Sequence, residues 1–372
     1  MGTETNRDDD IIAMCRRIFG DSDAYLDFYR RIMMPKNKVL TVYEGDRLVS
    51  MMHLNPYNLH VGRPLTDSYY IVAVATEEDK RHQGLMAGLM QRAMTAMYAE
   101  DIGFTYLMPA DEDIYKPFDF TTVWTKQMWK VRKNALAADM EKLHFKNWLD
   151  ATDAEKKETA EYTAKMLHGP RYVYCRRTVP FYDRIAEEMD AAGGELLICY
   201  REAPATVAGY GSRAELYGMM SYMLEERAVE VIEILTPEEN TGRVFLKNLW
   251  QRREGEFDAM LLLEDSSMRG EKQYKRLPGQ KIMMRLVHPE RFIPLLPCRE
   301  NFAGIIALTD PLIPENNGRF LLNLGDRCSF RPVREGMEAE CQGLAEYPMT
   351  EAELMAFVWE KSGLQALLTE IV

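Results

Sequence analysis

The segment from Ile71 to Met90 joins an apolar run, a polar loop and the start of a long amphipathic helix. Apolar residues 69–75 predict a buried strand, and polar residues 76–83 predict the loop that leaves it. Apolar residues then recur at i, i+3 and i+4 spacing, which predicts a helix whose methionine-rich stripe packs on a sheet. The stripe consists of Leu85, Met86, Leu89, Met90, Ala93, Met94 and Met97. A strand, loop and helix in this order favour a mixed α/β fold.

The loop carries Arg81, His82, Gln83 and Gly84 directly before the predicted helix. Unpaired backbone N–H groups and the positive end of the helix dipole converge there, so an anion is expected at this point. Gly84 would let the backbone approach a phosphate closely, and Arg81 would add positive charge. The alternative interpretation is an ordinary solvated loop between a strand and a helix.

The surrounding pattern predicts a first region over residues 1–135. Its expected elements are two helices within residues 11–34, strands at 39–43 and 48–54, and a strand at 104–108. The two early strands are expected to form a hairpin, because Gly45 stands beside Asp46 in the turn between them.

A second region, residues 136–284, repeats this order more loosely. The expected strands are 196–200, 206–210, 229–235 and 259–263, with a helix at 244–253. Its loop, residues 236–243, has no basic residue placed before a glycine as Arg81 is placed before Gly84 in the first loop. The second region is therefore expected to have lost the binding function of the first. A third region, residues 285–372, is rich in proline at its start and is expected to be a small α+β module.

Charge and composition exclude several classes of protein. Acidic residues outnumber basic residues by 58 to 46, for a net charge of −12, so the chain lacks the basic excess that nucleic-acid binding requires. No run of roughly 18 apolar residues predicts a membrane span, and the acidic start does not resemble a signal peptide. Six scattered cysteines and six unclustered histidines indicate a cytoplasmic protein without a metal site.

The predicted strand, loop and helix around Arg81 and Gly84 resemble those of the GNAT acyl-CoA N-acyltransferases, whose pyrophosphate loop reads Q/R-x-x-G-x-G/A. More narrowly, the chain is similar to the Eis-like (enhanced intracellular survival) branch. The motifs that carry the resemblance are Val74-Ala75-Thr76, residues 81–86, Pro109-Ala110, residues 114–120 and residues 310–320. The resemblance implies tandem GNAT domains, the second degenerate, followed by a C-terminal α+β domain similar to sterol carrier protein. It also implies a hexamer.

The resemblance implies roles for individual positions. The backbone of Val74, Ala75 and Thr76 would contact the pantetheine arm and thioester of acetyl-CoA. The pyrophosphate would lie on His82, Gln83, Gly84, Leu85, Met86 and Ala87, with Arg81 alongside, and Ala110 and Asp111 would lie near the arm's exit. Tyr115 matches the donor of a proton to the leaving thiolate, and the terminal carboxylate of Val372 matches the proton acceptor.

Three positions depart from the family pattern. Met86 stands where the broad pattern has Gly or Ala, and Glu78 replaces a common proline and adds negative charge near the phosphates. Asp119 replaces a glycine, but aspartate tolerates the left-handed conformation better than most residues.

The predicted reaction is direct attack of a primary amine on acetyl-CoA in a ternary complex, without a metal. The acceptor could be an aminoglycoside-like compound, a polyamine or a lysine side chain. Such an amine is mostly protonated at neutral pH and needs a base before it can attack. Two alternatives stay open: a lipid-binding protein that uses the C-terminal domain, and a non-catalytic scaffold that holds coenzyme A.

Overall fold

The structure, a computed structural model, describes residues 4–132, 143–202, 214–237, 239–263, 275–298 and 300–370. The chain forms two compact units that interleave along the sequence. The first contains Met1–Thr125, Gly169–Arg176 and Lys281–Val372, and the second contains Lys126–His168 and Arg177–Gln280. The predicted boundary after residue 135 lies outside the described residues, and the three-region division stays a prediction.

The first unit is built on a sheet with strand order β17-β7-β2-β3-β4-β12, and β1 pairs with β2 at one side. Neighbouring strands are antiparallel except for the parallel pairs β3–β4 and β17–β7. The strands are β1 (Lys38–Glu44), β2 (Arg47–Val61), β3 (Leu65–Thr76), β4 (Phe104–Leu107), β7 (Tyr172–Cys175), β12 (Lys275–Leu286, of which residues 281–286 belong to this unit) and β17 (Gln365–Leu367). The predicted hairpin and the strands before and after the long helix are confirmed.

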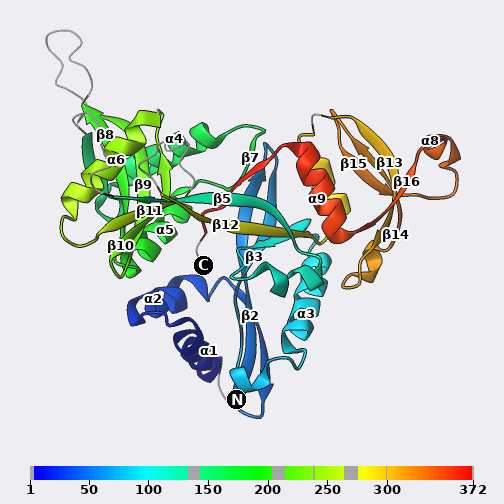
Figure 1. Cartoon of the computed structure of the whole chain (residues 1–372), viewed down its shortest axis with the longest axis horizontal. Coiled ribbons are helices and arrows are strands. Elements are labelled where there is room, and N and C mark those ends of the chain that lie inside the picture. The colour runs from blue at the N-terminus through cyan, green and yellow to red at the C-terminus, as the bar shows by residue number, and fades with distance from the viewer. Residues whose placement is uncertain are drawn as a thin grey trace, which may run out of the picture. The chain divides into compact units, whose positions relative to one another are not determined.

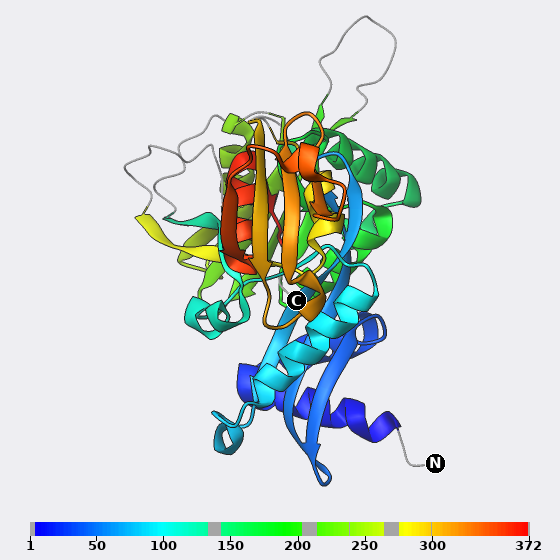
Figure 2. The same ribbon diagram turned by 90° about the vertical axis from the view of Figure 1, so that its right-hand side faces the viewer.

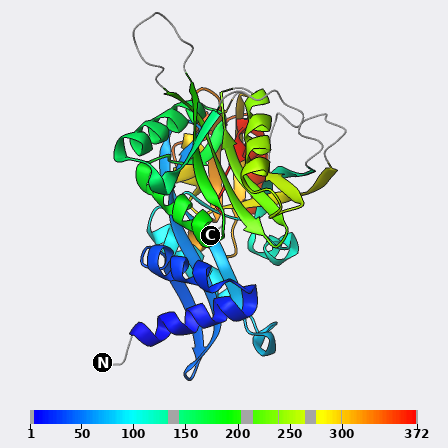
Figure 3. The ribbon, with the colours of Figure 1, turned by 90° about the vertical axis from the view of Figure 1, so that its left-hand side faces the viewer.

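Helices cover both faces of β2 and β3 (Figure 1). The helix α3 (Leu85–Ala99) lies on one face, seen in Figure 2, while α1 (Glu4–Phe19) and α2 (Asp23–Phe28) lie on the other, seen in Figure 3. A π-helical turn, η1 (Tyr29–Met33), continues α2. The stripe of α3 is buried from Leu89 to Met97, as its spacing predicts, because these side chains face the sheet.

A second sheet in the first unit has strand order β15-β14-β13-β16 (Figure 2). Its strands are β13 (Phe302–Thr309), β14 (Gly318–Leu324), β15 (Ser329–Pro332) and β16 (Glu346–Thr350), and α9 (Glu351–Ser362) follows them; two short helices, α7 (Pro289–Phe292) and α8 (Glu338–Cys341), also belong to this part. A capping box starts α9: the Thr350 hydroxyl accepts from the Glu353 N–H, and the Glu353 carboxylate accepts from the Thr350 N–H. This part of the unit is an α+β module, as predicted.

The second unit repeats the sequence of elements found around α3. Its strand order is β5-β11-β10-β9-β8-β6, and β10 and β11 are parallel. The elements are β5 (Thr121–Val131, from residue 126 in this unit), β6 (Leu143–Asn147), α4 (Asp153–Leu167), α5 (Val179–Ala191), β8 (Glu195–Glu202), β9 (Ala214–Glu225), β10 (Ala228–Leu235), α6 (Glu239–Arg252) and β11 (Ala259–Leu263). The strand predicted at 206–210 lies outside the described residues, and β9 was not predicted.

The core of the second unit explains why its helix α6 forms. Phe245, Leu246, Leu249 and Trp250 recur at helical spacing and are buried against the sheet together with Met260. No helix among the described residues is long and apolar enough to cross a membrane.

Candidate active site

The parallel strands β3 and β4 separate shortly after they meet. Their pairing joins Tyr69 to Thr105 and Tyr70 to Tyr106. β3 then continues to Thr76, still paired with β2, whereas β4 ends at Leu107. Among the described residues, the β4 side of β3 is therefore left unpaired from Ile71 onward. An edge of exposed backbone groups at the carboxyl end of a parallel pair is suited to binding an extended ligand.

A β-bulge interrupts β3 at this edge. Met51 pairs with Ala75 and His53 pairs with Val72, so β3 has one more residue than β2 between these pairs. Ala73 lies in the bulge with φ of 49°, in the left-handed region. Bulges re-aim the backbone beside active sites, and this bulge contains Ala73 and Val74 and directly precedes Ala75 and Thr76. Sequence reasoning missed it, because alanine carries no signal for a positive φ.

The loop after β3 is held by local hydrogen bonds. A short 3-10 helix, η2 (Glu78–Lys80), fills its middle. The Arg81 Nε donates to the Thr76 carbonyl at 3.3 Å, and the Gln83 side chain donates to the Asp79 carbonyl at 3.1 Å. Arg81, His82 and Gln83 are exposed beside Gly84, as the anion-binding hypothesis requires.

The first turn of α3 has backbone N–H donors that precede its first intrahelical bond. Gly84 is the N-cap with φ of 78°, no side chain caps the helix, and its first backbone bond runs from the Gly88 N–H to the Gly84 carbonyl at 3.0 Å. The N–H groups of Leu85, Met86 and Ala87 precede that bond. A Cβ added at Gly84 or Gly88 would meet no atom within 4 Å, so the approach is open. A pyrophosphate group fits this arrangement.

Arginines from other elements neutralise acidic groups of the same loop. Arg47 forms two bonds to the Asp79 carboxylate, at 2.9 and 2.8 Å, and holds the pKa of Asp79 below its ordinary value. Glu77 pairs with Arg17 of α1. Glu78, the departure noted in the sequence, is exposed. The pairing reduces the negative charge that these carboxylates present to an anion at Gly84.

Tyr115 lies on the segment that follows β4. It stands between two single 3-10 turns, η3 (Glu112–Ile114) and η4 (Lys116–Phe118), and its ring packs edge-on against Phe120 with 6.0 Å between centroids. Burial raises the pKa of the Tyr115 phenol, which therefore keeps its proton at neutral pH. Such a phenol can donate a proton to a leaving group.

The backbone around Tyr115 matches two sequence expectations. Ala110 and Asp111 are exposed between β4 and η3, and the Asp111 carboxylate accepts from the Asp113 N–H at 3.0 Å. Asp119 adopts φ of 58°, so the expectation that aspartate tolerates the left-handed conformation here is confirmed.

A buried arginine holds this segment from another strand. Arg285 of β12 is fully buried, and its Nε donates to the Phe118 carbonyl at 2.8 Å. The sequence contained no signal for this contact, because the two residues are 167 positions apart.

Val372, the predicted proton acceptor, lies outside the described residues. The tail that leads to it is described as far as Glu370 and is buried at Leu364, Ala366, Leu368 and Glu370. The tail enters the first sheet because β17 pairs in parallel with β7, which in turn pairs with β2. The expected burial of the apolar chain end is confirmed for Leu364 and Leu368.

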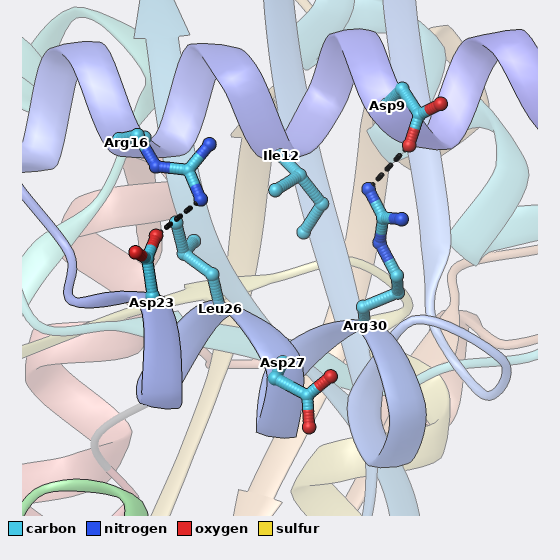
Figure 4. A pocket seen from close by; sticks show the side chains of 7 residues that line it. All are labelled: Asp9, Ile12, Arg16, Asp23, Leu26, Asp27 and Arg30. Carbon is cyan, nitrogen blue, oxygen red and sulfur yellow. Dashed lines mark hydrogen bonds and ion pairs between the residues drawn. The ribbon is translucent and has the colours of Figure 1, made fainter.

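Two surface hollows lie away from the predicted site residues. One, of about 470 Å³, lies between α1 and α2, where Arg16 pairs with Asp23 at 2.5 Å and Arg30 pairs with Asp9 at 2.6 Å (Figure 4). The other, of about 410 Å³, is lined by residues 122–124 and by residues of α9 and the segment after it. Neither contains a residue predicted to bind or react. Among the described residues, no group of three or more His, Cys, Asp and Glu side chains could hold a metal ion.

Comparison with known proteins identifies the fold. Residues 3–123 match the family described as the Acetyltransferase (GNAT) domain. Comparison with curated proteins finds no match.

Three solved structures are similar over most of this chain. A GCN5-related N-acetyltransferase from Kribbella flavida has a TM-score of 0.73 at 14% identity, covering 100% of this chain and 97% of that chain. A probable N-acyltransferase from Enterococcus faecalis V583 has a TM-score of 0.72 at 12% identity, with coverage of 96% and 87%. Eis1 from Mycobacterium abscessus has a TM-score of 0.63 at 11% identity, with coverage of 96% and 88%.

At these identities the solved structures establish the fold, while the domain match establishes the catalytic class. The chain therefore has the mixed α/β fold of the GNAT acyl-CoA N-acyltransferases and is an acetyltransferase whose GNAT domain spans residues 3–123.

Proposed function

We propose that this protein transfers an acetyl group from acetyl-CoA to a primary amine by direct attack in a ternary complex. The observation that carries the proposal is a combination of three features. β3 separates from β4, β3 bulges at Ala73, and the continuous segment from β3 leads to the start of α3 at Gly84, where no side chain caps the helix. GNAT domains use acetyl-CoA, and this segment offers backbone donors to an extended arm and to a pyrophosphate in succession.

The residues that would hold acetyl-CoA fall into two groups. The unpaired edge of β3 at Val74, Ala75 and Thr76 supports contacts to the pantetheine arm and a backbone N–H for the oxyanion of the tetrahedral intermediate. The first turn of α3 supports the pyrophosphate through the residues from His82 to Ala87, with Arg81 adding charge. Ala110 and Asp111 would lie along the arm, since they follow the adjacent strand β4.

The protein's own groups would move two protons. A carboxylate takes one proton from the ammonium group so that its nitrogen can attack the thioester carbonyl, and the resemblance assigns this role to Val372. As the C–S bond breaks, Tyr115 donates its phenolic proton to the departing sulfur. The new C–N bond leaves a second proton on nitrogen, which returns to the Tyr115 oxygen. The overall reaction yields one amide and the free thiol of coenzyme A, and it releases one proton.

The finer organisation belongs to the same proposal. The second unit would be a degenerate GNAT domain, since it repeats the order of elements but has no basic residue leading a glycine in residues 236–243. The C-terminal part would be the sterol-carrier-like domain, whose tail β17 joins the first sheet. We also propose a hexamer and a cytoplasmic location; none of the six cysteines, all in the described part of the chain, forms a disulfide.

The test measures thiol release from acetyl-CoA with a panel of aminoglycosides, polyamines and lysine peptides, and measures coenzyme A binding by calorimetry. We expect coenzyme A binding and turnover with at least one amine. Binding without turnover on any amine would support the scaffold alternative. Binding of fatty acids or sterols without binding of coenzyme A would support the lipid-binding alternative.

A further inference from the structure

Several buried polar side chains of the first unit have polar atoms without a hydrogen-bond partner in the part of the chain that the structure describes, and four of them belong to β2, β4 and the tail after β17. They are His53 and Asn55 of β2, Tyr106 of β4 and Glu370 of the tail, each at most 1% exposed. Among the described residues, no partner exists for the His53 Nε2, the Asn55 amide, the Tyr106 hydroxyl or either Glu370 carboxylate oxygen. Buried polar atoms are nearly always satisfied, so a group of exceptions points to a ligand.

The sheet register brings three of these side chains to one face. Asn55 pairs with Tyr70 and Tyr70 pairs with Tyr106, which places all three on the same side, and the Tyr70 and Tyr106 rings stack with 5.2 Å between centroids. His53 lies two residues from Asn55 on the same strand and therefore points to that face as well.

Glu370 reaches this face from the end of the chain. It follows Leu367, which pairs with Tyr174 of β7, and β7 lies next to β2. Burial is the largest cause of the raised pKa of Tyr106, and the negative charge of Glu370 is the second largest. The Glu370 carboxylate therefore lies close to the Tyr106 phenol.

The group coincides with the point where β3 and β4 separate. Tyr70 and Tyr106 form the last pair before the separation, and His53 pairs with Val72, the residue before the bulge at Ala73. The polar face therefore meets the edge to which the acetyl thioester is assigned.

The unpartnered polar groups on this face fit an amine. Burial lowers the pKa of His53 to about 3, and its Nδ1 lies 2.5 Å from the Tyr29 hydroxyl, so the imidazole is neutral at pH 7. Tyr106 keeps its proton for the reason given above. Glu370 contributes a carboxyl group, and the Asn55 amide oxygen and the Tyr106 hydroxyl oxygen can accept hydrogen bonds. A primary ammonium, with one positive charge and three N–H donors, complements this set.

We infer that Glu370 is a catalytic residue that binds the ammonium group of the acceptor and accepts its proton before attack. The inference rests on the proposed acetyl transfer, and it assigns the base of that reaction to Glu370 in place of the Val372 carboxylate. The N–H bond that breaks leaves its electron pair on nitrogen, the proton forms an O–H bond on the Glu370 carboxylate, and that proton later passes to solvent. The Asn55 amide oxygen would accept a hydrogen bond from the ammonium group and so orient the amine.

The test replaces Glu370 with glutamine, which keeps size and burial but cannot accept the proton. With an amine from the panel that the native protein acetylates, E370Q is expected to lose about 100-fold or more in kcat. Coenzyme A binding is expected to be unchanged. E188Q is a control for changing a buried carboxylate of the second unit: Glu188 of α5 is also 1% exposed and pairs with Arg184, so this variant is expected to be less stable but to keep native turnover while it is folded.

An aromatic amine separates proton removal from structural damage. Aromatic amines are unprotonated at neutral pH and need no base, so the deficit of E370Q is expected to shrink at least tenfold with such an acceptor. E370D, which keeps the carboxylate, is expected to recover part of the activity and covers the case in which E370Q fails to fold. Equal losses with both amine types would overturn the assignment.

Removing Val372 provides the remaining distinction. If E370Q turns over normally while the chain without Val372 is inactive, the terminal carboxylate is the base and the inference about Glu370 is wrong. If the native protein acetylates no amine at all, the proposed function itself fails, and that result is independent of Glu370.

Discussion

The Arg285 Nη2 donates to the Asp310 Oδ1 at 2.6 Å, and both side chains are completely buried. Arg285 also holds the Phe118 carbonyl in the segment that carries Tyr115. The Asp310 Oδ1 accepts from the N–H groups of Leu312 and Ile313, at 2.8 and 3.0 Å. This ion pair therefore joins the C-terminal part of the first unit to the segment that bears the proposed proton donor.

Replacing Asp310 with alanine is expected to destabilise the protein by about 3–5 kcal/mol, because it leaves a buried arginine without its partner. Urea unfolding measures the loss. The control is E346Q, which removes the exposed partner of Arg319 and should change the stability little. Similar losses for the two variants would contradict the role of the buried pair.

Replacing Tyr115 with phenylalanine is expected to lower kcat by about 100-fold, because the departing thiolate then receives no proton from the phenol. The dissociation constant of coenzyme A should stay unchanged. Since burial raises the pKa of Tyr115 above its ordinary value near 10, the native enzyme should keep its proton donor at pH 9. Native turnover by the phenylalanine variant would exclude Tyr115 as the donor.

Replacing Gly84 with alanine is expected to weaken coenzyme A binding, since an L side chain is strained at φ of 78° and would shift the first turn of α3. The strain should cost about 1 kcal/mol of stability. G20A is the matched control, because Gly20 has φ of 76° and equally open surroundings. Calorimetry should show weaker binding for G84A alone, and equal binding by both variants would exclude the pyrophosphate site.

The stability of the protein should depend on His53 below pH 6.5. Its pKa is about 3 in the folded state and about 6.5 in the unfolded chain, so the unfolded state binds one more proton between these values. Stability contributed by the neutral buried imidazole is complete above pH 6.5 and falls by about 1.4 kcal/mol for each unit below it. Between pH 7 and pH 5 the native protein should thus lose about 2 kcal/mol more than H53Q does. Parallel urea-unfolding profiles for the two proteins would show that the imidazole is not buried in its neutral form.

The local structure, meaning helix periodicity and turns, was the part of the fold that the sequence predicted. The apolar period of α3, the turn at Gly45 and the left-handed Asp119 each depend on neighbours within a few residues, and each is found as expected. The module boundaries were harder to predict, because β7 lies among residues of the second unit yet pairs with β2 of the first. Nothing in residues 172–175 by themselves indicates which sheet they join.

The sequence by itself determined the strand, the loop and the helix from residue 69 to residue 97, because periodicity and a glycine at the helix start act locally. Only the tertiary structure decided that β3 bulges at Ala73, that Arg285 holds the Tyr115 segment, and that Glu370 is buried beside Tyr106. These features depend on strand register and on pairing between distant segments. They are stabilised by contacts between distant segments, which cannot be read from any one stretch of the sequence.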